Sequence, residues 1–350
     1  MTNMVSLGFQ RELPDQMTLD VKYSGNIAYR LRTSTTLNPV SLTQLKQAQA
    51  DPNYFNQLVS NPYSGVLPST STVGSSSKIS ALSLMHAYSA FGQVSWDAAP
   101  LGKNIYDGFE AKLDKRIGGP DALTFQLAYT YSKTMNGTSY TNSWPYQDPT
   151  VRYEISPYDR AQVFTLASQW NLPIGRGQHF FSTPNRVVGE LIDGWEFSSI
   201  LSAQTGQPVG LNTGYYYDCN HSFAPKGGSS LKGWIYNDYS SGNSLGCYAA
   251  IPQYHLRNLP DRISTVRTPT EPNFDASMQK SFELYGRSML VFRVDAFNLT
   301  NSVLFPSPDT NPADGAPVRT ATGGYTGYGT VSQTQQNLPR VLQFALKLKF

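Results

Sequence analysis

The sequence predicts an all-β fold, a partial antiparallel transmembrane β-barrel of about nine up-and-down strands. Apolar and polar residues alternate along many segments, as they do in strands with one apolar face. Short and long connections alternate between these segments. The composition is rich in aromatic residues and poor in charged ones. We therefore expect residues 1–350 to form a single domain in which strands cross a membrane.

The composition argues against an ordinary soluble enzyme. Charged residues make up 15% of the chain, whereas typical soluble domains contain about 25%. Aromatic residues reach 13%, with 22 Tyr and 17 Phe, and Tyr and Trp suit a boundary between water and an apolar phase. The net charge of +3 is carried by scattered Lys and Arg residues, so we expect no nucleic-acid partner. The sequence contains no apolar run of about 18 residues, so it predicts no membrane-spanning helix. A β-barrel shows no such run, because its lipid-facing and lumen-facing residues alternate.

The clearest strand is the last one. Its apolar side chains fall on one face and are expected to face lipid, whereas Gln343, Ala345, Lys347 and Lys349 fall on the other. These lipid-facing residues are Leu342, Phe344, Leu346, Leu348 and Phe350. In the predicted strand 274–284, Lys280 is a charged residue on the otherwise apolar face. The predicted strands are residues 4–12, 17–31, 103–116, 123–132, 160–172, 191–205, 274–284, 290–298 and 340–350.

The connections between these strands predict the topology. Outer-membrane barrels have short periplasmic turns and longer extracellular loops, so the N-terminus is expected outside and Phe350 at the periplasmic side. The short connections are residues 13–16, 117–121, 173–190 and 285–286, and the long surface loops cover about 32–102, 134–159, 206–272 and 300–339. An odd number of strands leaves two open edges, which is costly in lipid, so we expect part of a larger barrel.

Several motifs together resemble the C-terminal barrel of Oar-like TonB-dependent outer-membrane receptors, the subgroup with a carboxypeptidase-regulatory-like extension. The matching segments occur in the same order as in that family. They are GFQRELP at 8–14, NPYSG at 61–65, AYTYSK at 128–133, DGWEF at 193–197 followed by GQP at 206–208, RVDAFNLTN at 293–301, and PRVLQFALKLKF at 339–350.

The resemblance implies a location in the cell outer membrane and a role in nutrient uptake. The chain would supply barrel wall and extracellular ligand-recognition loops to a barrel of about 22 strands. Its partners would be outer-membrane lipid, a plug domain, the TonB energy-transducing complex, and an extracellular small molecule or oligosaccharide. Barrel-like sequence begins within the first ten residues, with neither a signal peptide nor room for a plug, so we expect a piece that does not transport alone.

Aromatic and polar residues in the loops are the candidate ligand-binding groups. Flat rings can stack on sugars or siderophores while Asp and Asn side chains form hydrogen bonds. The alternative is that these rings pack on each other and hold the loops closed. The candidates are Tyr215, Tyr216, Tyr217, Asp218, Trp234, Tyr236 and Trp144.

The same loop region contains Cys219 and Cys247. In an oxidising compartment they would form a disulfide across the loop, and the alternative is a pair of free thiols. Residues 42–60 show a helix-like apolar pattern interrupted by Pro52, which predicts a short loop helix. Residues 323–329 are rich in Gly and predict a mobile loop with aromatic tips.

No enzyme motif is present, and we expect no catalytic residue, bound metal or cofactor. The four histidines, His86, His179, His221 and His255, lie far apart and are expected mostly in solvated loops. Strand carboxylates such as Glu110 with Asp114, or Asp295 with Glu283, could suggest glycoside hydrolysis. The polar face of a barrel wall accounts for them more simply. There we expect a charge network of Arg293 and Asp295 beside Lys347 and Lys349.

A secreted or surface β-rich binding or structural protein is the alternative reading. It would need a second protein layer over the apolar face of each strand, and the sequence offers no obvious segment for that layer.

Overall fold

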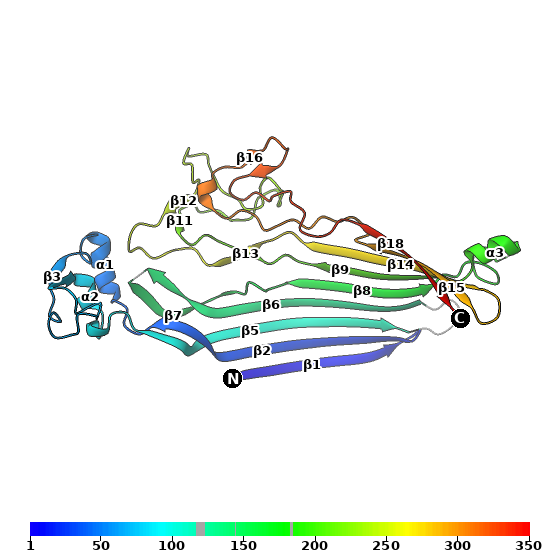
Figure 1. The fold of residues 1–350 in the computed structure, drawn as a ribbon, viewed down its shortest axis with the longest axis horizontal. Helices are drawn as coiled ribbons and strands as arrows, with labels where there is room; N and C mark the ends of the chain where they lie inside the picture. The colour runs from blue at the N-terminus through cyan, green and yellow to red at the C-terminus, as the bar shows by residue number, and fades with distance from the viewer. Residues whose placement is uncertain (117–122, 144, 183–184) are drawn as a thin grey trace.

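The computed structural model describes residues 1–116, 123–143, 145–182 and 185–350 and contains one 10-stranded antiparallel sheet. Its strands follow the order β1-β2-β5-β6-β8-β9-β14-β15-β18, and β7 pairs with β6 beside this path (Figure 1). The strands are β1 (Thr2–Leu13), β2 (Met17–Thr36), β5 (Ser95–Lys115), β6 (Leu123–Ser143), β7 (Tyr146–Ile155), β8 (Gln162–Asn171), β9 (Trp195–Gln204), β14 (Glu271–Glu283), β15 (Met289–Phe297) and β18 (Val341–Lys349).

The nine strands predicted from the sequence form the path of this sheet, in sequence order and with antiparallel neighbours. The sequence prediction was wrong about their length at one end. β2, β5 and β6 run on to Thr36, Ser95 and Ser143, beyond the limits that alternation suggested. The pairing of these extensions contains several register shifts, which interrupt the period of two although the strands remain paired.

The register places the apolar residues of neighbouring strands on one face of the sheet. Leu346 of β18 lies opposite Phe292 of β15, and Phe292 lies opposite Lys280 of β14. The apolar row continues through Trp195 of β9 to the strands beyond. Phe344 is 67% exposed and Leu346 68% exposed. No other segment of the described chain covers this outward face of β18.

Polar groups on the outward face have partners close by. The Lys280 ammonium donates a hydrogen bond to the backbone carbonyl of Asp193, which resolves the exception noted in the strand pattern. Ser168 and Ser199 lie directly opposite each other on β8 and β9, and their hydroxyls are 2.8 Å apart. Such pairs satisfy hydroxyls that would otherwise be unpaired in an apolar medium.

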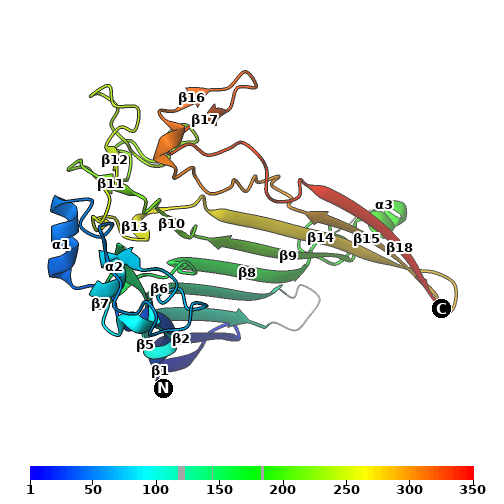
Figure 2. The ribbon, with the colours of Figure 1, turned by 60° about the vertical axis from the view of Figure 1, so that its left-hand side comes forward.

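The sheet is an open, curved wall (Figure 2). Among the described residues β1 pairs only with β2, and β18 only with β15. Both edge strands are exposed along nearly their whole length. The partial barrel expected from the sequence is therefore the observed form.

Long and short connections leave opposite ends of the sheet (Figure 1). The loop end carries α1 (Leu42–Ala50), α2 (Ala81–Met85) and the short strands β3 (Leu58–Ser60), β4 (Lys78–Ser80), β10 (Pro208–Gly210), β11 (Tyr215–Tyr217), β12 (Tyr248–Ala250), β13 (Arg262–Arg267), β16 (Val318–Arg319) and β17 (Tyr325–Thr326), with one-turn 3-10 helices at Ser89–Phe91 and Pro312–Asp314. The turn end carries the β1–β2 and β14–β15 turns and α3 (Arg186–Ile192). The predicted turn at 117–121 lies outside the described residues.

The loop helix predicted within residues 42–60 is α1, and it ends before Pro52. Ser41 and Gln44 form a capping box at its start, in which each side chain bonds the other residue's backbone N–H. Its buried Ala48 packs with Val40 and Phe55 in a small core. None of the helices in the described ranges is long and apolar enough to span a membrane.

Candidate ligand-recognition cap and inner face

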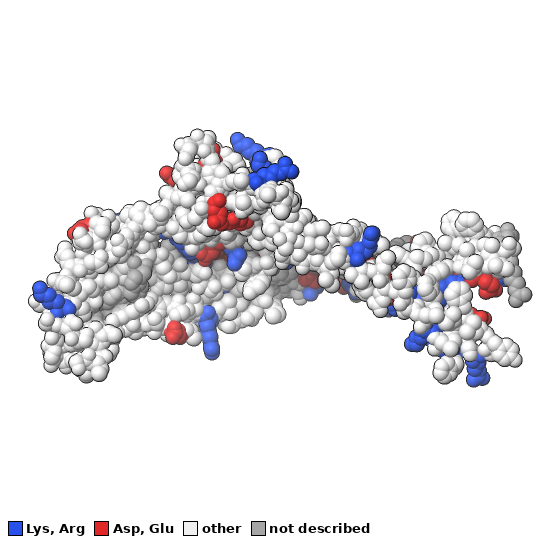
Figure 3. Space-filling view, turned by 45° about the horizontal axis from the view of Figure 1, so that its top comes forward, with Lys and Arg blue, Asp and Glu red and all other residues white. Residues whose placement is uncertain are grey.

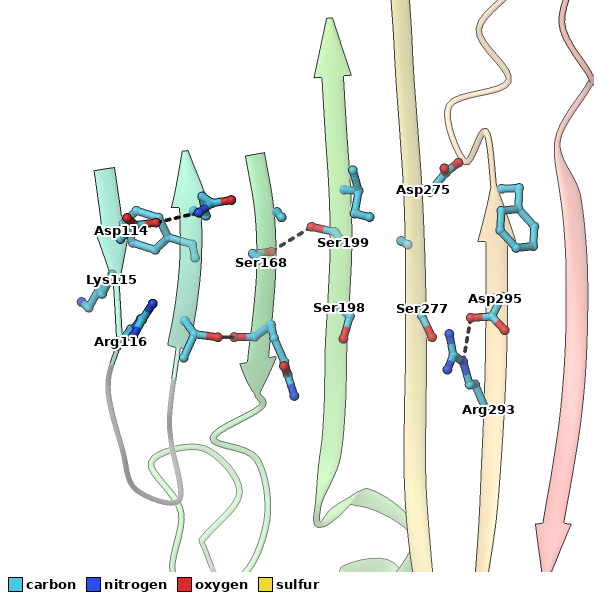
Figure 4. Close-up of a pocket in the computed structure, with 18 residues that line it drawn as sticks. Asp114, Lys115, Arg116, Ser168, Ser198, Ser199, Asp275, Ser277, Arg293 and Asp295 are labelled. Atoms are coloured by element: carbon cyan, nitrogen blue, oxygen red, sulfur yellow. Dashed lines mark hydrogen bonds and ion pairs between the residues drawn. The ribbon is translucent and has the colours of Figure 1, made fainter. Parts of the chain in front are cut away.

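The polar side of the sheet is concave and encloses a hollow of about 600 Å³. Strands β5, β6, β8, β9, β14 and β15 contribute to it, with Asp114, Ser277 and Asp295 among the lining residues (Figure 4). On the face shown in Figure 3, charged side chains are sparse and lie singly or in small groups. The hollow is lined by apolar residues and by charged residues of both signs, among them Asp114, Arg293 and Asp295, so it is neither an acidic nor a basic funnel.

Ion pairs neutralise several carboxylates of this inner face. Asp114 lies 2.9 Å from the Lys112 ammonium and also accepts a hydrogen bond from Gln126 at 3.0 Å. Glu110 lies 4.0 Å from Lys22. A glycosidase pair needs two carboxyls that face one substrate bond. Here Glu110 and Asp114 each bind a lysine instead.

The charge network predicted around Arg293 forms only in part. Arg293 donates to Asp295 within β15 at 2.8 Å. β15 and β18 do pair, but Lys347 lies opposite Val291, and Ala345 lies opposite Arg293. The lysines of β18 therefore stand nearer the turn end than the Arg293–Asp295 pair does.

Two long loops fold together at the loop end into a structure that we call the loop cap, residues 206–270 and 298–340. Its hydrophobic core draws on both loops. The disulfide between Cys219 and Cys247 closes the first loop, with a Cα–Cα distance of 5.3 Å. The core residues are Val209, Leu211, Ile235, Tyr248, Leu259, Ile263, Val266 and Tyr328.

Three of the candidate aromatics pack against this core. Tyr217 lies 4.6 Å from the ring of Phe223 and 5.1 Å from that of Tyr248, measured between centroids. Trp234 donates from Nε1 to the Arg267 carbonyl at 2.6 Å. Tyr215 also packs on the core. For these three residues the structure favours the packing alternative.

The other candidate ligand-binding residues that the structure describes do not belong to the cap core. Tyr216 sits between Tyr215 and Tyr217 on β11, so its ring points to the opposite face. Tyr236 stacks edge-on with His221 at 5.7 Å. The Asp218 backbone N–H bonds to the Cys247 carbonyl at 2.9 Å. Trp144 lies outside the described residues.

One expectation about loop residues was wrong. Tyr328, in the Gly-rich segment expected to be mobile, is 1% exposed, and its hydroxyl bonds that of Tyr248. Burial raises the pKa of both hydroxyls above its ordinary value. Among the histidines, His179 and His221 are exposed as expected for most of them, whereas His86 is buried and its Nδ1 lies 2.6 Å from the Asn38 carbonyl. Glycine content and loop position do not reveal which loop side chains another loop will cover.

A buried ion pair fastens the loop cap to the sheet. Asp159 is fully buried, and its Oδ2 accepts from Arg267 Nη2 at 2.5 Å. Its other oxygen accepts from the Thr134 backbone N–H at 2.5 Å. Arg267 also donates to the carbonyls of Asp159 and Gly206, at 3.2 and 3.1 Å. The two partners lie 108 positions apart, so no local pattern signals this contact.

A polar cleft of about 470 Å³ lies between the loop cap and the outer ends of β2, β6 and β7. The hydroxyl of Tyr140 beside it is buried and has no hydrogen-bond partner among the described residues. No sequence motif marks the cleft because its walls come from several separate segments. Among the lining residues are Thr138, Asn142, Gln147, His255, Arg257 and Asp261.

The Arg257–Asp261 pair in the cleft makes the stability of the cap pH-dependent. Burial by itself would raise the pKa of the Asp261 carboxyl. The hydrogen bond and charge of Arg257, with smaller contributions from Ser139 and Arg152, outweigh burial and lower this pKa from its ordinary value of 3.8. A carboxyl whose pKa is lower in the folded protein than in the unfolded chain stabilises the fold at pH values above its unfolded-state pKa. This stabilisation is lost as the pH falls through the lower, folded-state pKa.

We therefore expect Arg257→Gln to change the acid sensitivity of the cap. In the wild type, thermal stability should drop as pH falls through 3.8 toward the lowered pKa of Asp261. In the variant, stability at neutral pH should be lower, and the contribution of Asp261 to the acid drop should shrink, because its largest stabilising partner is gone. Near-ultraviolet circular dichroism at a series of pH values measures both. An unchanged acid profile would show that Arg257 does not control Asp261.

The comparisons with known proteins identify the family. A model described as an outer membrane beta barrel domain matches residues 1–343. The chain belongs to this outer membrane β-barrel family. Among solved structures, the outer membrane transporter YddB from Escherichia coli shares 9% identity and a TM-score of 0.41, with coverage of 99% of this chain and 32% of that chain. No curated protein matches the sequence.

Membership of the outer membrane β-barrel family shows what surrounds the apolar face of the sheet. The protein lies in the outer membrane, and the outward side chains of the sheet meet lipid. Outer-membrane barrels carry long loops outside the cell and short turns in the periplasm, so we expect the loop end with the loop cap to be extracellular and the turn end periplasmic.

Replacing Phe344 with Arg is expected to cost about 2–4 kcal/mol of unfolding free energy in lipid vesicles if the side chain lies at mid-bilayer. Gln343→Arg, one position away on the concave face, should cost much less, since its side chain avoids lipid. Denaturant titrations of the intact protein in vesicles measure both. Equal losses would show that the two faces have been assigned wrongly.

Proposed function

We propose that this chain is part of the barrel wall of a TonB-dependent outer-membrane transporter of the Oar-like kind, and that its loop cap recognises the ligand outside the cell. The polar cleft at the barrel mouth is the observation that carries this proposal, because it opens where the cap meets the wall strands. The concave polar face with its hollow lies on the inner side of the same wall.

The lining of the cleft favours a polar ligand. Hydroxyl and amide groups such as those of Thr138 and Asn142 both donate and accept hydrogen bonds. An oligosaccharide, a ferric chelate or a peptide presents matching groups. Tyr216 and Tyr236 remain candidates for ring stacking at the cap surface.

The alternative of a secreted β-rich protein requires a protein layer over the apolar face. In the described residues no segment covers that face of β18, and the family match agrees with a membrane location. Catalysis is not part of this proposal, since the carboxylates of Glu110, Asp114 and Asp295 are held in ion pairs.

The chain spans about a third of the length of the E. coli transporter chain with which it was compared. Transport, a plug domain and the TonB complex would therefore belong to a longer protein or to an assembly. In that assembly, the inner face with Asp114, Arg293 and Asp295 would contact the plug through polar groups. The open edges β1 and β18 would pair with further strands, which removes unpaired backbone groups from lipid.

Photo-crosslinking of neighbouring residues in cells tests this proposal. A benzophenone side chain at position 277 faces the hollow, whereas the same group at position 278 faces lipid. We expect position 277 to crosslink to a plug segment, seen by mass spectrometry, and position 278 to give no such product.

Immunoblotting with an antibody against residues 206–272 supplies the second test. A heat-modifiable outer-membrane band much larger than 38.7 kDa would support a longer transporter. A band at 38.7 kDa, together with no plug crosslink from position 277, would contradict the proposal.

A further inference from the structure

The connection between β8 and β9 is the longest of the periplasmic connections that the structure describes, and it carries α3 at its end (Figure 1). We call residues 172–182 and 185–194 the rim turn. Asn185 caps α3 by accepting a hydrogen bond from the Val188 backbone N–H at 2.9 Å. The segment is therefore a folded element rather than a plain linker.

Two contacts place the rim turn on the lipid side of the wall. Trp195 and Lys280 are paired neighbours on β9 and β14, and both point outward. The Trp195 indole donates from Nε1 to the Leu191 carbonyl at 3.0 Å. The Lys280 ammonium donates to the Asp193 carbonyl. Side chains on the outward face can reach α3 and its C-terminal cap only if the rim turn lies on that face.

Internal ion pairs orient α3 within the rim turn. Arg176 lies 3.0 Å from Glu190 and 3.5 Å from Asp193. A Cβ added at Gly189 would meet the Arg176 guanidinium at 2.6 Å, so this side of α3 faces the body of the turn. Val187 and Leu191 are four positions apart and therefore share the opposite face of the helix.

That opposite face is apolar and exposed. Val187 is 72% exposed and Leu191 60%. Phe180 and Phe181, also in the rim turn, are exposed as well. Exposed apolar residues that gather in this way mark an interaction surface.

We propose that the rim turn is an interfacial anchor that inserts these apolar side chains into the periplasmic leaflet of the outer membrane. The occupant is phospholipid because the patch continues the lipid-facing surface of β9 and β14 through Trp195. Tryptophan at a barrel rim sits at the headgroup level, with its ring in lipid and its N–H near polar groups. The anchor would fix the height of the wall in the membrane.

This inference depends on the outward face lying in lipid and does not depend on transport.

Fluorescent labels at single introduced cysteines test it in the intact protein, reconstituted in phosphatidylethanolamine–phosphatidylglycerol vesicles. Cys219 and Cys247 are joined in a disulfide, so an environment-sensitive nitrobenzoxadiazole label goes to the new cysteine. The variants are Leu191→Cys, Phe344→Cys for the lipid face, and Val66→Cys, an equally exposed apolar residue at the loop end.

We expect the label at position 191 to be quenched more by nitroxide lipids near the headgroup than by nitroxides deep in the bilayer, as for an element buried about 5–10 Å into the interface. The label at position 344 should show the reverse order, and the label at position 66 should be quenched by neither. A label at 191 that behaves like the one at 66, while 344 is quenched, would overturn the anchor alone. Equal quenching at 66 and 191 would also overturn it. Lack of quenching at 344 would remove the lipid face itself and the anchor with it.

Discussion

Replacing Arg267 with Met is expected to cost about 3–5 kcal/mol of stability, because it leaves the fully buried Asp159 carboxylate without its cation. Arg267 also donates to the carbonyls of Asp159 and Gly206, so the change removes the hydrogen bonds that join the cap to the loop before β8. We expect the loop cap to open while the sheet keeps its pairing. Hydrogen exchange followed by mass spectrometry should show faster exchange in residues 206–270.

Two further variants separate the charge effect from the loss of packing. Asp159→Asn combined with Arg267→Met leaves no buried charge, and the Asn oxygen can still accept from the Thr134 N–H. The double variant should therefore recover much of the lost stability. Lys22→Met, which breaks an exposed pair with Glu110, should change stability by only about 0–1 kcal/mol. An Arg267→Met variant that resembles Lys22→Met would contradict the role given to the buried pair.

Tyr328→Ala is expected to cost a similar amount, about 3–5 kcal/mol, because a fully buried aromatic ring is removed from the core of the loop cap. The change also leaves the Tyr248 hydroxyl without the partner that it has in the core. Thermal unfolding of the cap, followed by near-ultraviolet circular dichroism, measures the loss.

Matched substitutions make this result specific. Tyr158→Ala removes a ring that is 81% exposed at the same end of the barrel, so it should change stability very little. Tyr328→Phe keeps the ring and removes only the hydroxyl, so its cost should be about 1–3 kcal/mol. If Tyr328→Ala were as mild as Tyr158→Ala, the Gly-rich segment would be the mobile loop that the sequence suggested.

The strand assignments depended on local features. These were sufficient for the nine strands of the sheet path, but they missed the outer ends of β2, β5 and β6 and the strand β7, which lies in the predicted loop 134–159. Alternation in residues 342–350 fixed which side chains of the last strand share a face, and the register with β15 agrees with it. The long polar segments between strands marked the loop end. The family resemblance also pointed to an outer-membrane barrel, which the family model supports at the coarser level of an outer-membrane β-barrel.

The residues of the proposed ligand site were harder to predict. Tyr215, Tyr217 and Trp234 looked like binding groups because they combine rings with polar atoms, but they are partly buried and pack against the cap core. The cleft residues Asn142 and Asp261 carry no motif at all. Whether a loop ring is buried depends on which other loop folds over it, and the order of residues within one loop does not specify that neighbour.

By itself, the sequence determined the strands, their two faces and the two ends of the wall, because each follows from the period of two and from breaks in it. Only the tertiary structure decided which loop residues are buried and which segments they contact. The Asp159–Arg267 pair, the Tyr248–Tyr328 contact and the placement of the rim turn on the lipid side all join residues far apart in the chain. Such contacts form because burial of apolar surface brings the loops together, and buried polar groups then require partners from whichever segment lies nearest.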